Sequence, residues 1–210
     1  MAQSLVGAVV FGSLQAWADD VVFADSRLTQ CVSAAVSAAS VESAVDLTTL
    51  SCNAKGIDDA TGIEQLVKLE KLALFGNQLS TIDLRQLTAL KELNLANNQL
   101  TRIDVSNNSA LQVLYLFGNQ LVSLDLQQTP ALSKIKAEKN RLLVVNFGAQ
   151  PKLERIYLFD NKMEDIKIDG LTALRFIDVR SNPMPDEVYD YLDAFSGVKA
   201  SHDGNTEDWE

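Results

Sequence analysis

Hydrophobic positions recur along most of the chain with a constant spacing of 21 residues. Within each unit, apolar residues alternate with other residues, as in the stretches LEKLALFGN and LQVLYLFGN. An asparagine closes each stretch, at Asn77, Asn98, Asn119, Asn140, Asn161 and Asn182. A weaker copy, LTTLSCNAKGI, begins at Leu47 and brings the number of units to about seven. A repeat this regular determines the architecture of the chain.

The alternation within each unit predicts a short, half-buried β-strand. One unit cannot bury the apolar face of its strand alone, so the units must stack on one another into a solenoid. The segments between strands, such as STIDL, TRIDV and VSLDL, are too short and too rich in β-branched residues for full α-helices. We expect extended or 3₁₀-like chain there. The asparagine amides can both donate and accept hydrogen bonds, which predicts a structural ladder on backbone groups where the chain leaves each strand.

The pattern LxxLxLxxNxL resembles the leucine-rich repeat, and the 21-residue period with T/S-x-L-D-L returns is most similar to bacterial proteins of the internalin type. The resemblance implies an α/β solenoid: a curved right-handed arc with a parallel β-sheet on its concave face and extended or 3₁₀ segments on its convex face. It also implies non-catalytic binding of macromolecules at the concave face.

Both ends of a solenoid expose its core and need caps. Apolar residues from Leu28 to Ala39 fall on one face of a helix whose N-cap is Asp25 or Ser26. A second helix begins near Pro185 and Asp186, and VKASH predicts a last strand before an acidic tail. The predicted divisions are an apolar segment (1–18), an N-terminal helical cap (19–46), the repeats (47–182), and a C-terminal cap with its tail (183–210).

The N-terminal segment resembles a secretory signal. An apolar run from Leu5 ends at Ala16, Trp17 and Ala18 before two aspartates, although no Lys or Arg precedes it. The run is too short for a membrane span, which needs roughly 20 residues. We expect secretion or a periplasmic location, or a cytoplasmic one if residues 1–18 are retained. In an exported protein Cys31 and Cys52 would form a disulfide, and in the cytoplasm they would stay buried thiols.

The net charge and the absence of known catalytic motifs disfavour several classes of function. The formal charge of −10 disfavours binding to nucleic acid or to an anionic membrane. Catalysis has little support, because His202 is the single histidine and no phosphate-binding, zinc or dithiol motif occurs. We expect no enzyme activity, cofactor or metal site.

The outward positions of the predicted strands form the candidate site. Three such positions in each of six repeats carry five cations and three anions, a net charge of +2, and six of these positions are Phe or Tyr. With neighbouring strands about 4.8 Å apart, Phe75, Phe117 and Phe159 in alternate repeats should lie roughly 10 Å from one another. The predicted partner-binding residues are Lys71, Phe75, Tyr115, Phe117, Lys134, Lys136, Arg155, Tyr157, Phe159, Phe176 and Arg180.

The aromatic and basic residues predict recognition of a protein partner, because protein interfaces are centred on aromatic residues and arginine. The net charge of +2 predicts an acidic contact surface on that partner. We expect the protein to be a monomer. One alternative is that the aromatic residues only stabilise the sheet by pairing across strands. Another is a carbohydrate-binding or cell-surface adhesion module, in which Tyr and Phe stack on sugar rings. An intracellular scaffold is the third.

Overall fold

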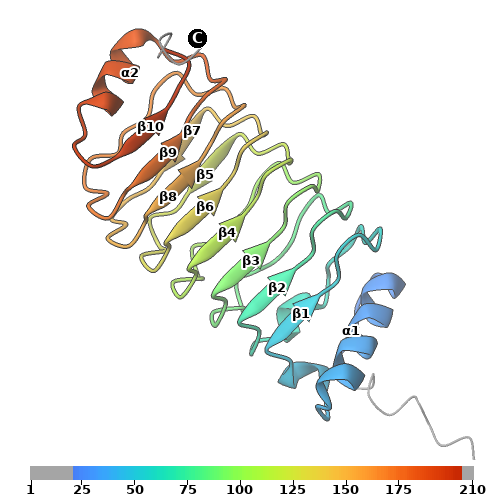
Figure 1. The fold of residues 1–210 in the computed structure, drawn as a ribbon. Helices are drawn as coiled ribbons and strands as arrows, with labels where there is room; N and C mark the ends of the chain where they lie inside the picture. The colour runs from blue at the N-terminus through green and yellow to red at the C-terminus, as the bar shows by residue number, and fades with distance from the viewer. Residues whose placement is uncertain (1–20, 205–210) are drawn as a thin grey trace, which may run out of the picture.

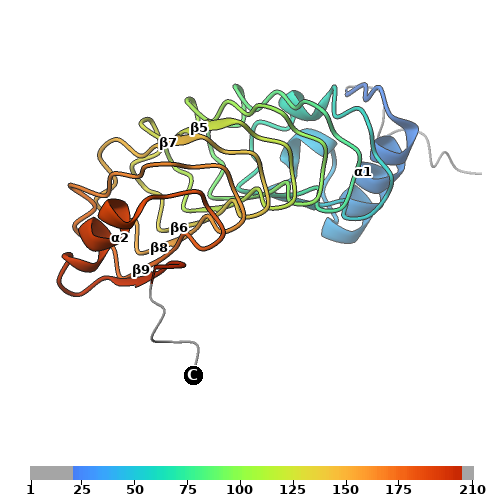
Figure 2. The same ribbon diagram turned by 90° about the horizontal axis from the view of Figure 1, so that it is seen from above.

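The structure is a computed structural model that describes residues 21–204. Eight short parallel strands form one sheet in the order β1-β2-β3-β4-β6-β8-β9-β10 (Figure 1). Seen from above, the molecule is a gentle arc with this sheet along one side and the return segments along the other (Figure 2). The strands are β1 (Thr49–Ser51), β2 (Lys71–Ala73), β3 (Glu92–Asn94), β4 (Val113–Tyr115), β6 (Lys134–Lys136), β8 (Arg155–Tyr157), β9 (Phe176–Asp178) and β10 (Lys199–Ser201).

The register of the sheet follows the sequence repeat. From β2 to β9 each residue pairs with the residue 21 positions later, so Leu72 lies beside Leu93 and Leu93 beside Leu114. The central residue of each of these strands is buried and packs into one continuous hydrophobic core. The predicted leucine-rich repeat solenoid with helical caps is therefore confirmed.

The six ladder asparagines are buried and satisfy backbone groups of two successive units. Asn98 is representative: its Nδ2 donates to the carbonyl oxygens of Leu74 and Leu95 (3.0 and 2.9 Å), and its Oδ1 accepts a hydrogen bond from the Leu79 N–H (3.0 Å). The same three kinds of bond recur in the other five units. Each asparagine thus removes unpaired polar groups from the core.

The convex side is mostly extended chain, as expected, with a second two-stranded parallel sheet of β5 (Ser123–Asp125) and β7 (Val144–Asn146). An aspartate recurs in these return segments because it stabilises the turn that follows. Asp83, Asp104 and Asp125 each accept a hydrogen bond at Oδ1 from the backbone N–H two residues later. A second column of buried polar residues lies on this side, a feature that we did not predict: Asn108, Thr129 and Gln150.

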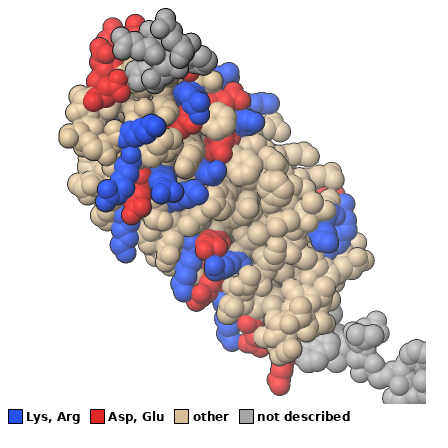
Figure 3. Space-filling model, in the orientation of Figure 1, with Lys and Arg blue, Asp and Glu red and all other residues tan. Residues whose placement is uncertain are grey.

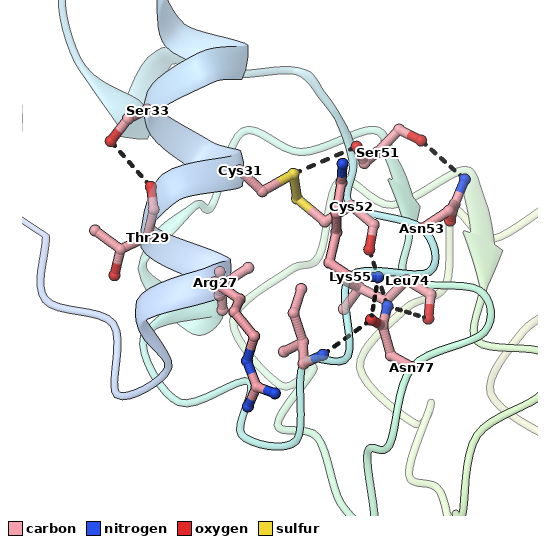
Figure 4. Close-up of a disulfide and its surroundings, with 12 residues drawn as sticks. Arg27, Thr29, Cys31, Ser33, Ser51, Cys52, Asn53, Lys55, Leu74 and Asn77 are labelled. Atoms are coloured by element: carbon pink, nitrogen blue, oxygen red, sulfur yellow. Dashed lines mark hydrogen bonds between the residues drawn. A yellow bond between two sulfur atoms is a disulfide. The ribbon is translucent and has the colours of Figure 1, made fainter.

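The N-terminal cap is helix α1 (Ser26–Ala39), followed by the 3₁₀ segment η1 (Ala44–Asp46); a further 3₁₀ segment, η2 (Ile63–Gln65), follows β1. Asp25 caps α1 by accepting hydrogen bonds from the N–H groups of Arg27 and Leu28. The disulfide predicted between Cys31 and Cys52 is present and joins α1 to the chain just after β1 (Figure 4).

The C-terminal cap is helix α2 (Asp186–Asp193), after which β10 adds the last strand of the sheet. The predicted signal segment at residues 1–18 and the end of the acidic tail at 205–210 lie outside the described residues.

Candidate interaction surface

The outward side chains of the large sheet stand in three columns, because successive strands are in register. Hydrogen bonds just beyond the strands extend the order to the third column: the Gly76 N–H donates to the Ala96 carbonyl, and the Gly118 N–H to the Glu138 carbonyl. All eleven predicted partner-binding residues therefore lie on one face, and we call this face the concave surface. The third column reads Phe75, Ala96, Phe117, Glu138, Phe159 and Arg180.

The six aromatic side chains of the concave surface are half-buried, and four of them form two ring contacts. The rings of Phe75 and Phe117 have centroids 6.2 Å apart, so the expected spacing of roughly 10 Å is wrong for this pair. The two rings lean together across Ala96, which has no exposed surface. A small residue between two large ones allows this contact. Tyr157 makes a similar contact with Phe176, at 5.2 Å.

Lysine side chains lie over these rings. The Lys134 Nζ is 5.5 Å from the centroid of Tyr115 and 5.9 Å from that of Tyr157, and the Lys136 Nζ is 4.9 Å from Tyr157. Arg180 approaches Phe159 at 6.0 Å. Such placements are attractive because the ring face is electron-rich. They combine the aromatic and cationic residues into one continuous surface.

The charges on this surface are unevenly distributed. Lys71 is paired with Glu92 (3.0 Å) at the N-terminal half, and Arg180 with Asp178 (2.7 Å) at the other end. Between these pairs Lys134, Lys136 and Arg155 make no ion pair with any described residue, within the distances that define one. Figure 3 shows Lys and Arg gathering over the C-terminal half of the sheet. The positive charge therefore belongs mainly to β6 and β8.

Two of the three anions of this face are buried, Asp178 and Glu138, but only Asp178 is paired, with Arg180. Glu138 is only 8% exposed, and its Oε2 has no hydrogen-bond partner. Desolvation by the surrounding protein is the main influence on the carboxyl and raises its pKa, and the nearby Asp178 acts in the same direction. A hydrogen bond from the backbone of Glu138 itself and the charges of Lys136 and Lys139 lower the pKa in part. The sequence showed Glu138 as one of three anions on the face but did not show that it is buried.

The described residues were also compared with what a histidine-based site, a metal site and a membrane-spanning helix require. His202 is buried in the C-terminal cap, where it stacks on Tyr189 (4.5 Å) and its Nε2 contacts an Asp193 oxygen at 3.1 Å. Across residues 21–204, no three His, Cys, Asp or Glu side chains are grouped so that they could hold a metal ion. Within the same range no helix is long and apolar enough to cross a membrane.

Comparison with known proteins agrees with this architecture. The family described as "Leucine Rich repeats (2 copies)" matches residues 67–108. Comparison with curated protein sequences gives no match. Among solved structures, an internalin (inlF) from Listeria monocytogenes is similar, with 23% identity and a TM-score of 0.61 over 86% of this chain and 63% of that chain. The chain thus spans less than two thirds of that structure.

Internalin C2 (inlC2) from the same organism is also similar, with 24% identity and a TM-score of 0.61 over 87% of this chain and 95% of that chain. These likenesses concern the fold, and the matched repeat family and the 21-residue period agree with them. The chain therefore has a leucine-rich repeat fold similar to that of these two internalins.

Proposed function

We propose that the protein is a recognition module whose concave surface binds a protein partner through Tyr115, Phe117, Tyr157 and Phe159. The observation that carries the proposal is the half-buried aromatic group on the sheet, bordered by three lysine or arginine side chains that have no ion-pair partner among the described residues. Rigid aromatic side chains bury a large area at little cost in conformational entropy, so they often supply most of the binding energy of an interface.

The charge of this surface favours an acidic contact region on the partner. Lys134, Lys136 and Arg155 project from adjacent strands of a protein whose formal charge is −10. Opposite charge at the interface gives specificity and speeds association. The partner is therefore expected to present Asp and Glu around an apolar centre.

We also propose that the protein acts after export. The disulfide between Cys31 and Cys52 supports this, because such bonds persist in oxidising compartments and are rare in the cytoplasm. The measurement is the thiol content of the protein isolated from its native cells under conditions that block thiol exchange. Two free thiols in that material would contradict export.

The test of recognition is capture of proteins from the native organism and its surroundings on immobilised wild-type protein and on two triple variants. The first variant changes the concave surface: Phe117→Ala, Phe159→Ala and Lys136→Glu. The second is a matched control on the convex side, where Leu143 and Val144 are 58% and 55% exposed: Leu143→Ala, Val144→Ala and Arg102→Glu. Both variants carry the same change of charge.

We expect a partner that binds the wild type and the control but is lost by the concave variant, with all three proteins folded at the temperature of the capture experiment. Equal capture by the concave variant would overturn the proposal. Capture of glycans on a carbohydrate array, with no protein retained, would instead indicate the carbohydrate-binding alternative.

A further inference from the structure

Glu138 stands between two phenylalanines on the concave surface. The Gly118 N–H donates to the Glu138 carbonyl and the Lys139 N–H donates to the Phe159 carbonyl, each at 3.0 Å, so the backbone ladder continues through this position. Phe117 and Phe159 occupy the same column in the two adjacent units. The carboxylate therefore has an aromatic neighbour on either side and belongs to the surface that we propose as the interface.

The environment of this carboxyl group is unusual for a buried acid. The residue is 8% exposed, and Oε2 is enclosed without a hydrogen-bond partner, although buried polar groups are almost always paired. Two lysines that could pair with it lie elsewhere: Lys136 is over the ring of Tyr157 at 4.9 Å, and Lys139 over Phe159 at 6.0 Å. Less than 1 Å² of this oxygen is exposed, so a hydrogen-bond donor from outside the chain reaches it only when the Glu138 side chain or a flanking ring moves.

Packing alone does not call for an acid at this position. The equivalent place between Phe75 and Phe117 holds Ala96, whose side chain is fully buried under the contact of the two rings. An apolar residue would fill the space between Phe117 and Phe159 without an unpaired oxygen. A glutamate there is costly to the isolated protein, so its benefit is expected in the bound state.

The carboxylate of Glu138 and the two neighbouring phenylalanine rings indicate which kind of hydrogen-bond donor would bind at this position. A carboxylate oxygen accepts hydrogen bonds, and those from charged donors are shorter and stronger than those from neutral donors. Phenyl faces attract cations and also pack against the apolar stem of a long basic side chain. A single lysine or arginine satisfies all of these conditions.

We infer that Glu138, between Phe117 and Phe159, receives one basic side chain of the bound protein, inserted through the concave surface. This inference rests on the proposed function. It adds a specific feature to the partner: one lysine or arginine at the centre of an otherwise acidic contact region. The inserted nitrogen donates to Glu138 while the surrounding Lys134, Lys136 and Arg155 contact acidic groups.

The test uses small molecules that carry the charged head group of lysine or arginine on a short apolar stem. Full-length protein labelled with ¹³C in its Glu and Phe side chains is titrated with n-butylammonium, with n-butylguanidinium and, as a neutral donor, with n-butanol. The Glu138 carboxyl signal is identified by its absence from the Glu138→Gln variant. Glu92→Gln serves as the matched control, because Glu92 lies on the same face but is exposed and already paired with Lys71.

We expect the cationic probes to shift the Glu138 and neighbouring Phe signals saturably at millimolar concentration. Binding should weaken about tenfold or more in Glu138→Gln, as expected for a lost charge-assisted hydrogen bond, and remain unchanged in Glu92→Gln. The inference is overturned if no saturable shift occurs, if Glu138→Gln binds the cations equally well, or if n-butanol binds as strongly as they do.

The capture experiment separates this inference from the broader proposal. If the concave triple variant loses the partner but Glu138→Gln retains it with undiminished affinity, recognition stands and the role of Glu138 is wrong. If the triple variant also retains the partner, the proposed function itself fails.

Discussion

At the scale of single residues, the same position in the repeat can serve opposite purposes. Ala96 and Glu138 occupy equivalent places in the third column, two units apart, and both side chains are buried beside phenylalanine. Ala96 allows Phe75 and Phe117 to touch, which stabilises the sheet. Glu138 instead places an unpaired carboxyl oxygen in the same kind of space. The first residue contributes to the fold, whereas the second lowers the stability of the free protein.

Replacing Glu138 with methionine should therefore stabilise the protein in a pH-dependent way. Burial raises the pKa of Glu138 above its usual 4.5, so between these two values the folded state binds more protons than the unfolded state. The free energy of unfolding of the wild type consequently falls as the pH rises through that interval. At pH 7 to 8 Glu138→Met should melt at a higher temperature than the wild type, and the advantage should shrink below pH 4.5.

Thermal melts of both proteins between pH 3.5 and 8 give the comparison, with Glu92→Met as a control at an exposed carboxylate of the same face. A stability advantage of Glu138→Met that does not change with pH would show that the effect comes from packing rather than from burying the charge.

At the scale of elements, the disulfide fixes the N-terminal helix to the repeat array. α1 covers the first unit, and the bond between Cys31 and Cys52 closes a loop with a sequence separation of 21. Asp25 reinforces the junction: its Oδ2 accepts a hydrogen bond from the Asp58 N–H, and Arg27 bridges both aspartates. The Arg27 guanidinium holds the pKa of Asp25 well below its usual range. Lys68 adds a second ion pair, to Asp46 of η1, so the cap has one covalent and two ionic connections to the array.

Loss of the disulfide should lower the free energy of unfolding by about 3 kcal/mol, the chain-entropy estimate for a loop of this length. Because each unit of a solenoid contacts mainly its neighbours, the loss should begin locally. Amide exchange after reduction should accelerate first in α1 and β1 and much less in β8 and β9. A Cys31→Ala, Cys52→Ala variant should show the same profile without reductant. Uniform acceleration along the chain would contradict this picture.

At the scale of the whole molecule, the sequence determines the solenoid because the signals of the repeat are local. The leucine alternation, the asparagine at Asn77 and its equivalents, and the capping aspartate Asp25 each act within a unit or its neighbour. The contact between the rings of Phe75 and Phe117 and the burial of Glu138 could not be predicted from such local signals. They depend on side-chain conformations across three strands, and an average strand spacing does not specify these. Asn108, Thr129 and Gln150 each donate a side-chain hydrogen bond to a backbone carbonyl of the convex side, to Leu87, Leu126 and Phe147 in turn. Because the three residues differ in type, the sequence did not show this column.

The charge distribution of the whole molecule leads to a last prediction about binding. A chain of formal charge −10 repels an acidic partner at long range, whereas Lys134, Lys136 and Arg155 attract it at contact. The Lys136→Glu and Arg102→Glu variants have the same net charge, −12, but only the first changes the concave surface. Lys136→Glu should weaken the affinity for the captured partner about tenfold, while Arg102→Glu should change it less than about twofold.

Salt supplies the second measurement, because screening acts most strongly on exposed charges. Raising the ionic strength from about 0.15 to 0.5 M should weaken binding of the wild type and of Arg102→Glu, since screening reduces the local attraction. The same rise in ionic strength should weaken binding of Lys136→Glu less, because this variant has already lost the attraction that Lys136 contributes. Equal losses in the two variants would mean that Lys136 contributes nothing to the salt-dependent attraction, which would contradict its proposed role in recognition.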